Sequence, residues 1–222
     1  MKKLTVAVGK GRLGKEVANL FEAIGADVSE LREALAGNSR SLVVSEDKLH
    51  LRFILAKAMD VPTFVEHGSA DIGIAGKDVL METGAEVAEL LDLGYSACRF
   101  VLAVPNSSGI ERVSQLDYDC RVASRYVNVT RRFLEEHGIQ ADVIPLNGSV
   151  ELAPLVELAD AIVDITETGR TLEENGLRVV AEIAHSSARL IANRISYKVE
   201  YERIGLIASA LRRLVDKEVG VQ

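Results

Sequence analysis

Residues 160–171 read Asp-Ala-Ile-Val-Asp-Ile-Thr-Glu-Thr-Gly-Arg-Thr and combine a strand, a tight polar loop and a helix start. The apolar run 161–165 is typical of a buried strand, and Asp160 and Asp164 punctuate it. The loop that follows offers hydroxyls, a glycine and the free N–H groups of a helix start, which together favour a bound anion. Acidic side chains at a strand end can hold ribose hydroxyls or a divalent metal. The stretch therefore indicates a phosphorylated sugar as ligand, although a capped helix with a glycine turn explains the loop about as well when it is taken alone.

Length, charge and cysteine content limit the class of protein. With 222 residues, of which 48% are hydrophobic, the chain can form one large or two small domains with real cores. The sequence contains no apolar run long enough for a transmembrane helix, and its N-terminus does not resemble a signal peptide. Cys98 and Cys120 are few and widely spaced, so we expect a cytoplasmic protein with free thiols. The net charge of −7 argues against nucleic-acid binding but allows a polyanionic small ligand where cations gather.

Short apolar strands alternate with helical patterns along the chain. Strands are expected at residues 4–8, 41–44, 50–56, 71–75, 98–104, 121–123, 141–145, 161–165 and 188–193. This alternation predicts α/β domains with mainly parallel sheets. The pattern changes near residues 93–105, which indicates two lobes. In such folds, ligands bind at the carboxyl ends of strands.

Further candidate contacts follow other strands. Lys10 and Arg12 flank a glycine after the first strand, and an arginine fork beside a lysine favours phosphate. Gly76 ends an apolar strand, where close packing and a nearby ligand explain a glycine about equally well. Arg125 leads into a helix start with two more arginines, an arrangement that a bound anion would favour. Glu151 lies near another helix start, and an ordinary first-turn acid remains a competing interpretation.

Several segments, in their order and spacing, resemble ATP phosphoribosyltransferase, the catalytic protein that opens histidine biosynthesis. The segments are Gly9-Lys10-Gly11-Arg12-Leu13, Asp71-Ile72-Gly73-Ile74-Ala75-Gly76-Lys77-Asp78-Val79-Leu80, Glu89-Leu90-Leu91-Asp92-Leu93-Gly94, Asn128-Val129-Thr130-Arg131-Arg132-Phe133, and four pieces of residues 147–198 that include Glu167-Thr168-Gly169-Arg170-Thr171-Leu172. The resemblance extends to about residue 200. The chain departs from the family pattern at Gly9, where the family usually has proline, and at Lys57-Ala58, where it commonly has Arg-Pro.

The resemblance implies the two-lobed fold of the type II periplasmic solute-binding proteins, with a ligand cleft between the lobes. Residues 1–96 and 186–222 would form lobe I, and residues 97–185 would form lobe II with the phosphate loop. It also implies a Mg²⁺-dependent glycosyltransferase. In the expected reaction, adenine N1 of ATP attacks C1′ of 5-phosphoribosyl-1-pyrophosphate and yields N1-(5-phosphoribosyl)-ATP and pyrophosphate.

On this interpretation, the loop Thr168-Gly169-Arg170-Thr171 holds the 5-phosphate of the sugar, and Glu167 lies at its entrance. Asp160 and Asp164 would address ribose hydroxyls or the metal, with Asp164 as a catalytic residue.

The remaining candidates would serve the other parts of the substrates. Lys10 and Arg12 would be catalytic contacts of pyrophosphate or of the ATP phosphates. Gly76, Arg125 and Glu151 would be further substrate contacts, with Gly76 on the nucleotide side.

Only about one helix follows Lys198, so the chain resembles the short form of the family, which lacks a regulatory domain of its own. Such proteins work with a separate subunit similar to histidyl-tRNA synthetase, and we expect a homodimer within that hetero-oligomer, without nucleic-acid or membrane partners. Two alternatives stay open. One is a catalytically silent two-lobed sensor of nucleotides or phosphosugars. The other is a phosphoribosyltransferase with a different acceptor, because a phosphate loop does not specify the nucleophile.

Overall fold

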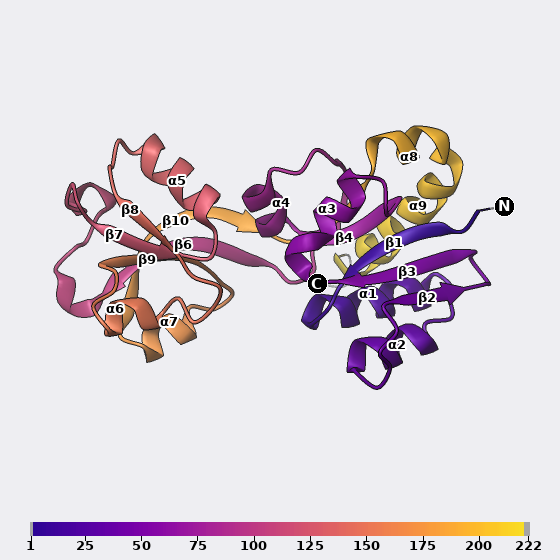
Figure 1. Ribbon diagram of the computed structural model, residues 1–222, viewed down its shortest axis with the longest axis horizontal. Helices are drawn as coiled ribbons and strands as arrows, with labels where there is room; N and C mark the ends of the chain where they lie inside the picture. Colours follow the sequence, from indigo (N-terminus) through magenta and orange to yellow (C-terminus); the bar gives the residue numbers. More distant parts are fainter. Residues whose placement is uncertain (1, 220–222) are drawn as a thin grey trace. The chain divides into compact units, whose positions relative to one another are not determined.

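The computed structural model describes residues 2–219 and contains two compact units (Figure 1). The first unit runs to Ser96 and resumes at Ser187, and the second consists of Ala97–Ser186. The second unit is thus inserted into the first in sequence. The sequence prediction assigned Ser186 to lobe I, whereas the structure places it in the second unit.

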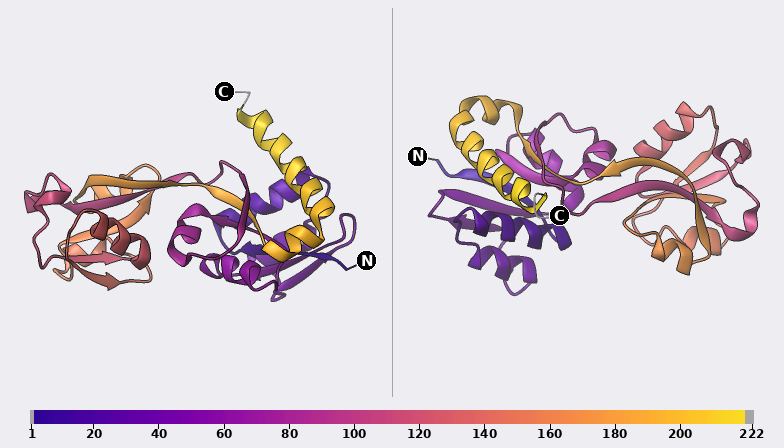
Figure 2. Two further views of the ribbon diagram at one scale, coloured as in Figure 1. Left: turned by 90° about the horizontal axis from the view of Figure 1, so that it is seen from above. Right: turned by 180° about the vertical axis from the view of Figure 1, so that it is seen from behind.

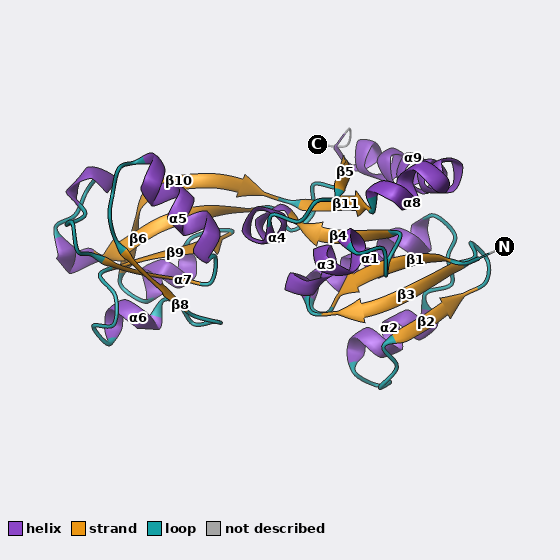
Figure 3. Ribbon diagram, turned by 45° about the horizontal axis from the view of Figure 1, so that its top comes forward, coloured by secondary structure: helices purple, strands orange, loops and turns teal. Residues whose placement is uncertain are grey.

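The first unit is built on a six-stranded sheet in the order β2-β3-β1-β4-β11-β5 (Figure 3). Its strands are β1 (Leu4–Gly9), β2 (Val43–Glu46), β3 (Leu51–Ala56), β4 (Ile72–Gly76), β5 (Ala88–Asp92) and β11 (Ala188–Ala192). β1 pairs in parallel with β3 and β4, while β2, β11 and β5 join through antiparallel pairings. The prediction of a mainly parallel sheet therefore holds only at the centre, and the sheet as a whole is mixed.

Helices cover both faces of this sheet. They are α1 (Arg12–Ala23), α2 (Ser29–Ala36), α3 (Val61–Glu66), α4 (Lys77–Thr83), α8 (Arg194–Val199) and α9 (Tyr201–Val219), with a 3₁₀ turn at Ala58–Asp60. Val6 and Val8 of β1 pack into the core shared with α1, α2 and α9, whereas Ala7 packs against α3. This division follows from the alternation of side chains along a strand. α9 contacts α1 and is the yellow helix in both views of Figure 2.

The second unit has a five-stranded sheet in the order β10-β6-β9-β7-β8. Its strands are β6 (Cys98–Pro105), β7 (Arg121–Ser124), β8 (Asp142–Pro145), β9 (Ala161–Thr166) and β10 (Leu177–Ser186). β7 is parallel to β8 and β9, whereas β6 is antiparallel to β9 and β10. This sheet is mixed as well, because β6 runs opposite to the other four strands.

Helices and a hydrophobic core hold the second unit together. Its helices are α5 (Val127–Glu136), α6 (Leu152–Leu155) and α7 (Arg170–Glu174), with 3₁₀ turns at Asn106–Ser108 and Val113–Gln115. Val101, Ile162 and Leu172 belong to the core that faces α6 and α7. On the strand neighbouring β9, Phe100 meets Tyr126 at the start of α5 edge-to-face, with ring centroids 4.8 Å apart.

The sequence prediction did not include β10, although it is ten residues long. Its pairing with β6 shifts register between Val179 and Ala181 and again between Glu182 and Ala184. Because each shift breaks the period-two alternation of side chains, the segment has no strand pattern in its sequence. α2, β5 and α8 were also not predicted.

Candidate functional site

The loop after β9 has the local structure expected of an anion cradle. β9 ends at Thr166, whose Oγ1 accepts the N–H of Gly169 at 2.8 Å and so folds the chain back on itself. Gly169 adopts φ 85°, in the left-handed region that favours glycine. The buried Leu172 anchors α7 in the core, while Thr168, Arg170 and Thr171 stay exposed. The loop therefore presents hydroxyls and a guanidinium to solvent from a fixed backbone.

Thr166 is a residue that the sequence analysis missed as part of this loop. Threonine in a strand is ordinary, so only its bond to Gly169 identifies its role. Thr168 Oγ1 adds a longer contact with the N–H of Arg170 at 3.4 Å. Arg170 also lies 3.9 Å from Glu174 one turn later, and both side chains are largely exposed.

Asp164 is the most perturbed acid of the second unit. Its Oδ1 accepts the N–H of Ile165 at 2.8 Å. Burial raises the pKa of Asp164 to about 6; the Ile165 N–H opposes this shift, the negative charge of Glu151 adds to it, and the positive charge of Arg125 opposes it. Glu151 and Arg125, which were predicted separately from the sequence, thus both act on Asp164.

The sheet register explains why Arg125 and Asp164 lie close together. In the parallel pair β7–β9, Ser124 lies beside Val163, so the next residues along the chain are Arg125 and Asp164. Glu151 reaches the same place from the N-cap position of α6. Since Asp164 lies three residues before Glu167, its carboxylate and the phosphate loop share the carboxyl end of β9. Partly buried acids with shifted pKa values concentrate at functional sites.

Asp160 does not belong to this group. It precedes β9, at the amino end of the strand, and Asp164 lies four residue steps further along, which corresponds to about 13 Å. Its carboxylate pairs with Arg121, which donates from Nη2 at 3.0 Å and from its backbone N–H at 2.8 Å. The Arg121 hydrogen bonds lower the pKa of Asp160. The structure therefore gives Asp160 the role of joining the starts of β7 and β9.

In the first unit, Lys10 and Arg12 follow the carboxyl end of β1. The backbone N–H of Lys10 donates to Ala56 at 3.0 Å, and Arg12 opens α1 with Glu16 one turn later at 3.7 Å. Both cationic side chains are exposed. Gly11 between them has φ 109°, so the loop turns through a conformation that other residues rarely adopt.

Gly76 has a packing explanation. It lies at the N-cap of α4 with ordinary backbone angles, and a Cβ on it would come within 2.0 Å of Oδ1 of Asp78. Since Asp78 is buried, a side chain at position 76 would force that carboxylate to move, which favours glycine. Close packing, one of the two interpretations of this glycine, is thus sufficient, and no ligand is needed to account for it.

The carboxylates also bear on how Mg²⁺ could bind. Within residues 2–219, no group of three or more His, Cys, Asp or Glu side chains is placed to hold a metal ion. Mg²⁺ is usually held by one or two carboxylates together with substrate phosphates. Asp164 and Glu151 fit an ion that arrives with a phosphorylated substrate, and do not fit a resident metal.

Comparison with known proteins assigns the family. The HisG model, described as ATP phosphoribosyltransferase, matches residues 57–213. Relatives of the same name from Ruminiclostridium cellulolyticum and Symbiobacterium thermophilum are 47% and 48% identical to this chain; the alignments cover 96% and 98% of this chain and 97% of each relative. This chain belongs to the ATP phosphoribosyltransferase family. The residues matched by the family model include Asp164, Glu151 and the phosphate loop, whereas Lys10 and Arg12 lie before the matched region.

Solved structures agree with this assignment. The ATP phosphoribosyl transferase (HisG:HisZ) complex from Thermotoga maritima contains a chain with TM-score 0.83 and 33% identity, over 97% of this chain and 98% of that one. The alkanesulfonate-binding protein SsuA from Xanthomonas axonopodis pv. citri, bound to MOPS, has TM-score 0.57 at 13% identity, over 96% of this chain and 73% of that one. The second likeness bears on the fold alone and confirms the expected binding-protein architecture. No helix within residues 2–219 is long and apolar enough to cross a bilayer.

Proposed function

We propose that this chain catalyses the first step of histidine biosynthesis, the transfer of a phosphoribosyl group from 5-phosphoribosyl-1-pyrophosphate to N1 of the adenine of ATP. The lone pair of N1 forms the new bond to C1′ while the bond from C1′ to the pyrophosphate oxygen breaks and its electrons leave with pyrophosphate. The observation that carries the proposal is the meeting of Asp164, Glu151 and Arg125 beside the phosphate loop, in a chain of this family.

The residues of the second unit fit the sugar half of this reaction. Thr168, Arg170 and Thr171 bind the 5-phosphate through hydroxyls and a guanidinium on a backbone that Gly169 and Thr166 hold in place. Charge develops on the sugar ring as pyrophosphate departs. A carboxylate in a partly buried place stabilises that positive charge more than it would in water. Asp164 in its ionised form supplies this carboxylate.

Three further parts of the proposal concern cations and location. Mg²⁺ bound to Asp164 and Glu151 together with the substrate phosphates would neutralise charge on the leaving pyrophosphate. Lys10 and Arg12 contact pyrophosphate or the ATP phosphates. A cytoplasmic location is consistent with Cys98 and Cys120, which are not joined in a disulfide.

The phosphate loop is tested by Thr171→Ala. Loss of one hydrogen bond to a charged group costs about 1 kcal/mol or more, so the dissociation constant for phosphoribosyl pyrophosphate should rise about fivefold or more by calorimetry. Thr63→Ala, at an exposed threonine of α3 in the other unit, is the matched control and should leave the constant unchanged. Equal affinities in wild type and Thr171→Ala would show that this loop does not bind phosphoribosyl pyrophosphate.

We further propose a regulatory partner. The relative from Thermotoga maritima forms a HisG:HisZ complex, and the present chain aligns with 98% of its length. The chain should therefore convert ATP and phosphoribosyl pyrophosphate faster when the corresponding subunit of its own organism is added. Inhibition by histidine should require that subunit. Inhibition of the isolated chain by histidine would refute the proposal of a regulatory partner.

A further inference from the structure

The first unit contains a largely apolar cavity beside α9. The cavity measures about 430 Å³ and lies between α9 and the turn that joins β2 to β3. Its apolar lining comes from Ile24, Leu49, Leu206, Ile207 and Ala210, and its polar lining comes from Lys48, His50 and Arg203. Cavities of this size, with a mostly apolar wall and a few polar groups, are typical of sites for small organic molecules.

One side of α9 forms a wall of this cavity. Its residues are spaced three or four apart, so they share a face of the helix: Arg203, Leu206, Ile207 and Ala210. Ile204 and Leu211 anchor the helix, because both are buried in the core that also contains α1. Leu206 is 72% exposed. The helix thus offers a bulky apolar side chain to a ligand from a fixed backbone.

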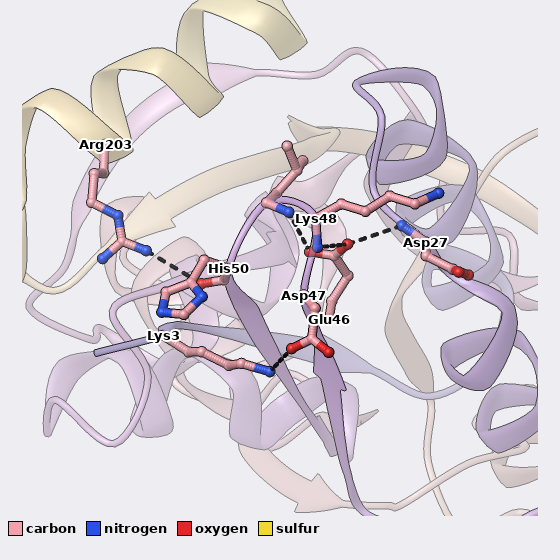
Figure 4. A network of polar contacts seen from close by, with 8 residues as sticks. Lys3, Asp27, Glu46, Asp47, Lys48, His50 and Arg203 are labelled. Carbon is pink, nitrogen blue, oxygen red and sulfur yellow. Dashed lines mark hydrogen bonds and ion pairs between the residues drawn. The ribbon is translucent and has the colours of Figure 1, made fainter. Parts of the chain in front are cut away.

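The turn between β2 and β3 forms the opposite wall, and it is rigid (Figure 4). The buried carboxylate of Glu46 accepts the N–H groups of Lys48 at 2.9 Å and of Leu49 at 2.8 Å, which closes the turn. It also accepts the N–H of Asp27 at 3.2 Å and so ties the turn to the segment between α1 and α2. A wall fixed in advance loses little conformational entropy when a ligand binds.

His50, the residue before β3, has a costly backbone conformation. Its φ is 58°, in the left-handed region that residues other than glycine seldom adopt. The carbonyl of His50 accepts the N–H of Leu4 at 3.1 Å and a hydrogen from Nη2 of Arg203 at 3.2 Å. Two partners therefore hold this residue in place, and they use both lone pairs of its carbonyl. Strain that the surroundings maintain in this way is concentrated at functional sites.

The polar side chains of the lining offer hydrogen-bond donors. Arg203 and Lys48 can only donate. Within residues 2–219, the guanidinium of Arg203 donates to the carbonyls of Lys2 and His50 and to the carboxylate of Glu200. A guanidinium carries five N–H groups, so these acceptors do not use all of them. A ligand with an acceptor group can therefore bind to Arg203 without displacing its present partners.

The cavity has no matching acid. None of the described residues that line it is an Asp or Glu. Three acids around it already have partners, because Asp47 pairs with Lys3 at 2.5 Å, Glu200 pairs with Arg203 at 3.1 Å, and Glu46 accepts the N–H groups of the turn. A carboxylate in the cavity therefore finds donors, whereas an ammonium group finds no carboxylate in the lining.

The cavity is remote from the phosphate contacts proposed in the first unit. β1 and β3 are parallel, and His50 lies at their amino ends, whereas Lys10 and Arg12 follow the carboxyl end of β1. Lys10 donates to the carbonyl of Ala56, the last residue of β3. The six residue steps from His50 to Ala56 correspond to about 20 Å along the strand. A ligand in the cavity thus does not compete with a substrate for Lys10 or Arg12.

We propose that this cavity is a binding site for a small organic acid that has an apolar body, one carboxylate and no cationic group. The apolar body packs against Leu49, Leu206 and Ile207. The carboxylate accepts hydrogen bonds from Arg203, next to His50. Amino acids do not fit, because their ammonium group would leave water without gaining an acceptor. The site therefore takes a ligand of a different chemical class from both proposed substrates.

Three probes that differ in one group test the chemistry of the site. Hydrocinnamate, its amide and phenylalanine share the same aromatic body, and each is titrated into the full chain while the amide NMR signals of residues 48–51 and 203–210 are followed. Hydrocinnamate should shift these signals and bind about tenfold or more tightly than its amide, because hydrogen bonds to a charged acceptor are the stronger ones. Phenylalanine should bind no better than the amide. Saturating ATP should not displace hydrocinnamate.

Leu206 allows a test of charge at a position that the fold leaves exposed. Leu206→Asp should weaken hydrocinnamate binding about tenfold or more, and Leu206→Lys should strengthen it, because the two substitutions place opposite charges beside the carboxylate. Ile195→Asp is the matched control, since Ile195 is 73% exposed and lies in α8 outside the lining. It should leave the affinity for hydrocinnamate unchanged. The amide NMR spectrum of each variant shows whether it is folded.

Arg203→Gln tests the donor. This variant should lose the preference for hydrocinnamate over its amide, and a general loosening of the fold would weaken both probes alike. Equal affinities of wild type for the two probes, equal effects of Leu206→Asp and Ile195→Asp, or displacement of hydrocinnamate by ATP would overturn the proposal. So would the absence of any shift at residues 48–51 when hydrocinnamate is added.

Discussion

Asp164 combines a cost to the fold with a role in the proposed reaction. Its folded-state pKa of about 6 lies above the ordinary 3.8, so between about pH 4 and pH 6 the folded state binds more protons than the unfolded state. Stability falls as the pH rises through this window, and the ionised carboxylate destabilises the fold at neutral pH. Asp164→Asn should therefore stabilise the protein by about 1–2 kcal/mol at pH 7.5, measured by urea unfolding, while it reduces turnover strongly.

The pH dependence of the stability difference between Asp164→Asn and wild type serves as the control. As the pH falls below about 4, the Asp164 carboxyl becomes protonated in both states of the wild type, so the stability difference should shrink towards zero. A constant difference from pH 3.5 to pH 7.5 would mean that the effect comes from packing and not from charge.

Glu151 provides a second prediction at the residue scale. Its negative charge helps to raise the pKa of Asp164, so Glu151→Gln should lower that pKa. If ionised Asp164 is required, the acidic limb of kcat/KM against pH should lie near pH 6 in wild type and move to lower pH in the variant. The profile is measured with phosphoribosyl pyrophosphate as the varied substrate. Arg125→Gln should move the acidic limb to higher pH. If the limb were unchanged in both variants, the ionisation seen in the profile would not be that of Asp164.

At the scale of elements, Gly14 fixes how α1 meets the end of β1. A Cβ at Gly14 would lie 2.4 Å from the carbonyl oxygen of Gly9 and 2.8 Å from Leu35. Gly14→Ala should therefore destabilise the protein by about 1–3 kcal/mol and shift the loop that holds Lys10 and Arg12. The destabilisation is measured as a lower temperature of thermal unfolding, and the shift of the loop as a changed KM for ATP.

Gly205 is the matched control within a helix. It lies in α9, and nothing lies within 4 Å of its added Cβ. Gly205→Ala should stabilise the protein by about 0.5–1 kcal/mol through helix propensity and leave the KM for ATP unchanged. Equal effects of the two substitutions would show that the contact with Gly9 does not constrain α1.

For the whole molecule, the two-unit division predicts independent folding of the insertion. Ser186 pairs with Cys98, so the ends of the second unit are neighbours on adjacent strands. The unit also has its own core around Val101 and Ile162. Residues 97–186 expressed alone should give dispersed amide NMR signals and one cooperative thermal transition. A collapsed, poorly dispersed spectrum would show that the first unit is needed for folding.

The first unit should also fold when the second unit, residues 97–186, is deleted. Ala188 donates to the carbonyl of Tyr95 at 2.9 Å, and Leu93 donates to that of Ala188 at 2.9 Å. The two chain segments that lead to and from the insertion therefore already lie side by side within this unit. A short glycine-rich link in place of residues 97–186 should leave its unfolding transition intact.

Much of this protein was determined by its sequence locally. The strand before Thr166, the loop with Gly169, and the cations Lys10 and Arg12 after the first strand could all be predicted, because apolar runs, glycines and helix starts act over a few residues. The order of such segments was also sufficient to indicate the family. Strand 188–193 and a helix after Lys198 were also expected, and both are present.

Only the tertiary structure decided which of these residues meet. Asp160 and Asp164 look equivalent in the sequence, yet the direction of β9 places them at opposite ends of a strand, one beside Arg121 and the other beside Glu151 and Arg125. β10 is a strand because β6 pairs with it across its register shifts, despite its irregular pattern. Strand order, direction and register depend on hydrogen bonds between residues far apart in the chain, and the raised pKa of Asp164 depends on burial. Sheet topology and this pKa are not encoded in any short stretch of sequence, because they arise only when distant segments pack together.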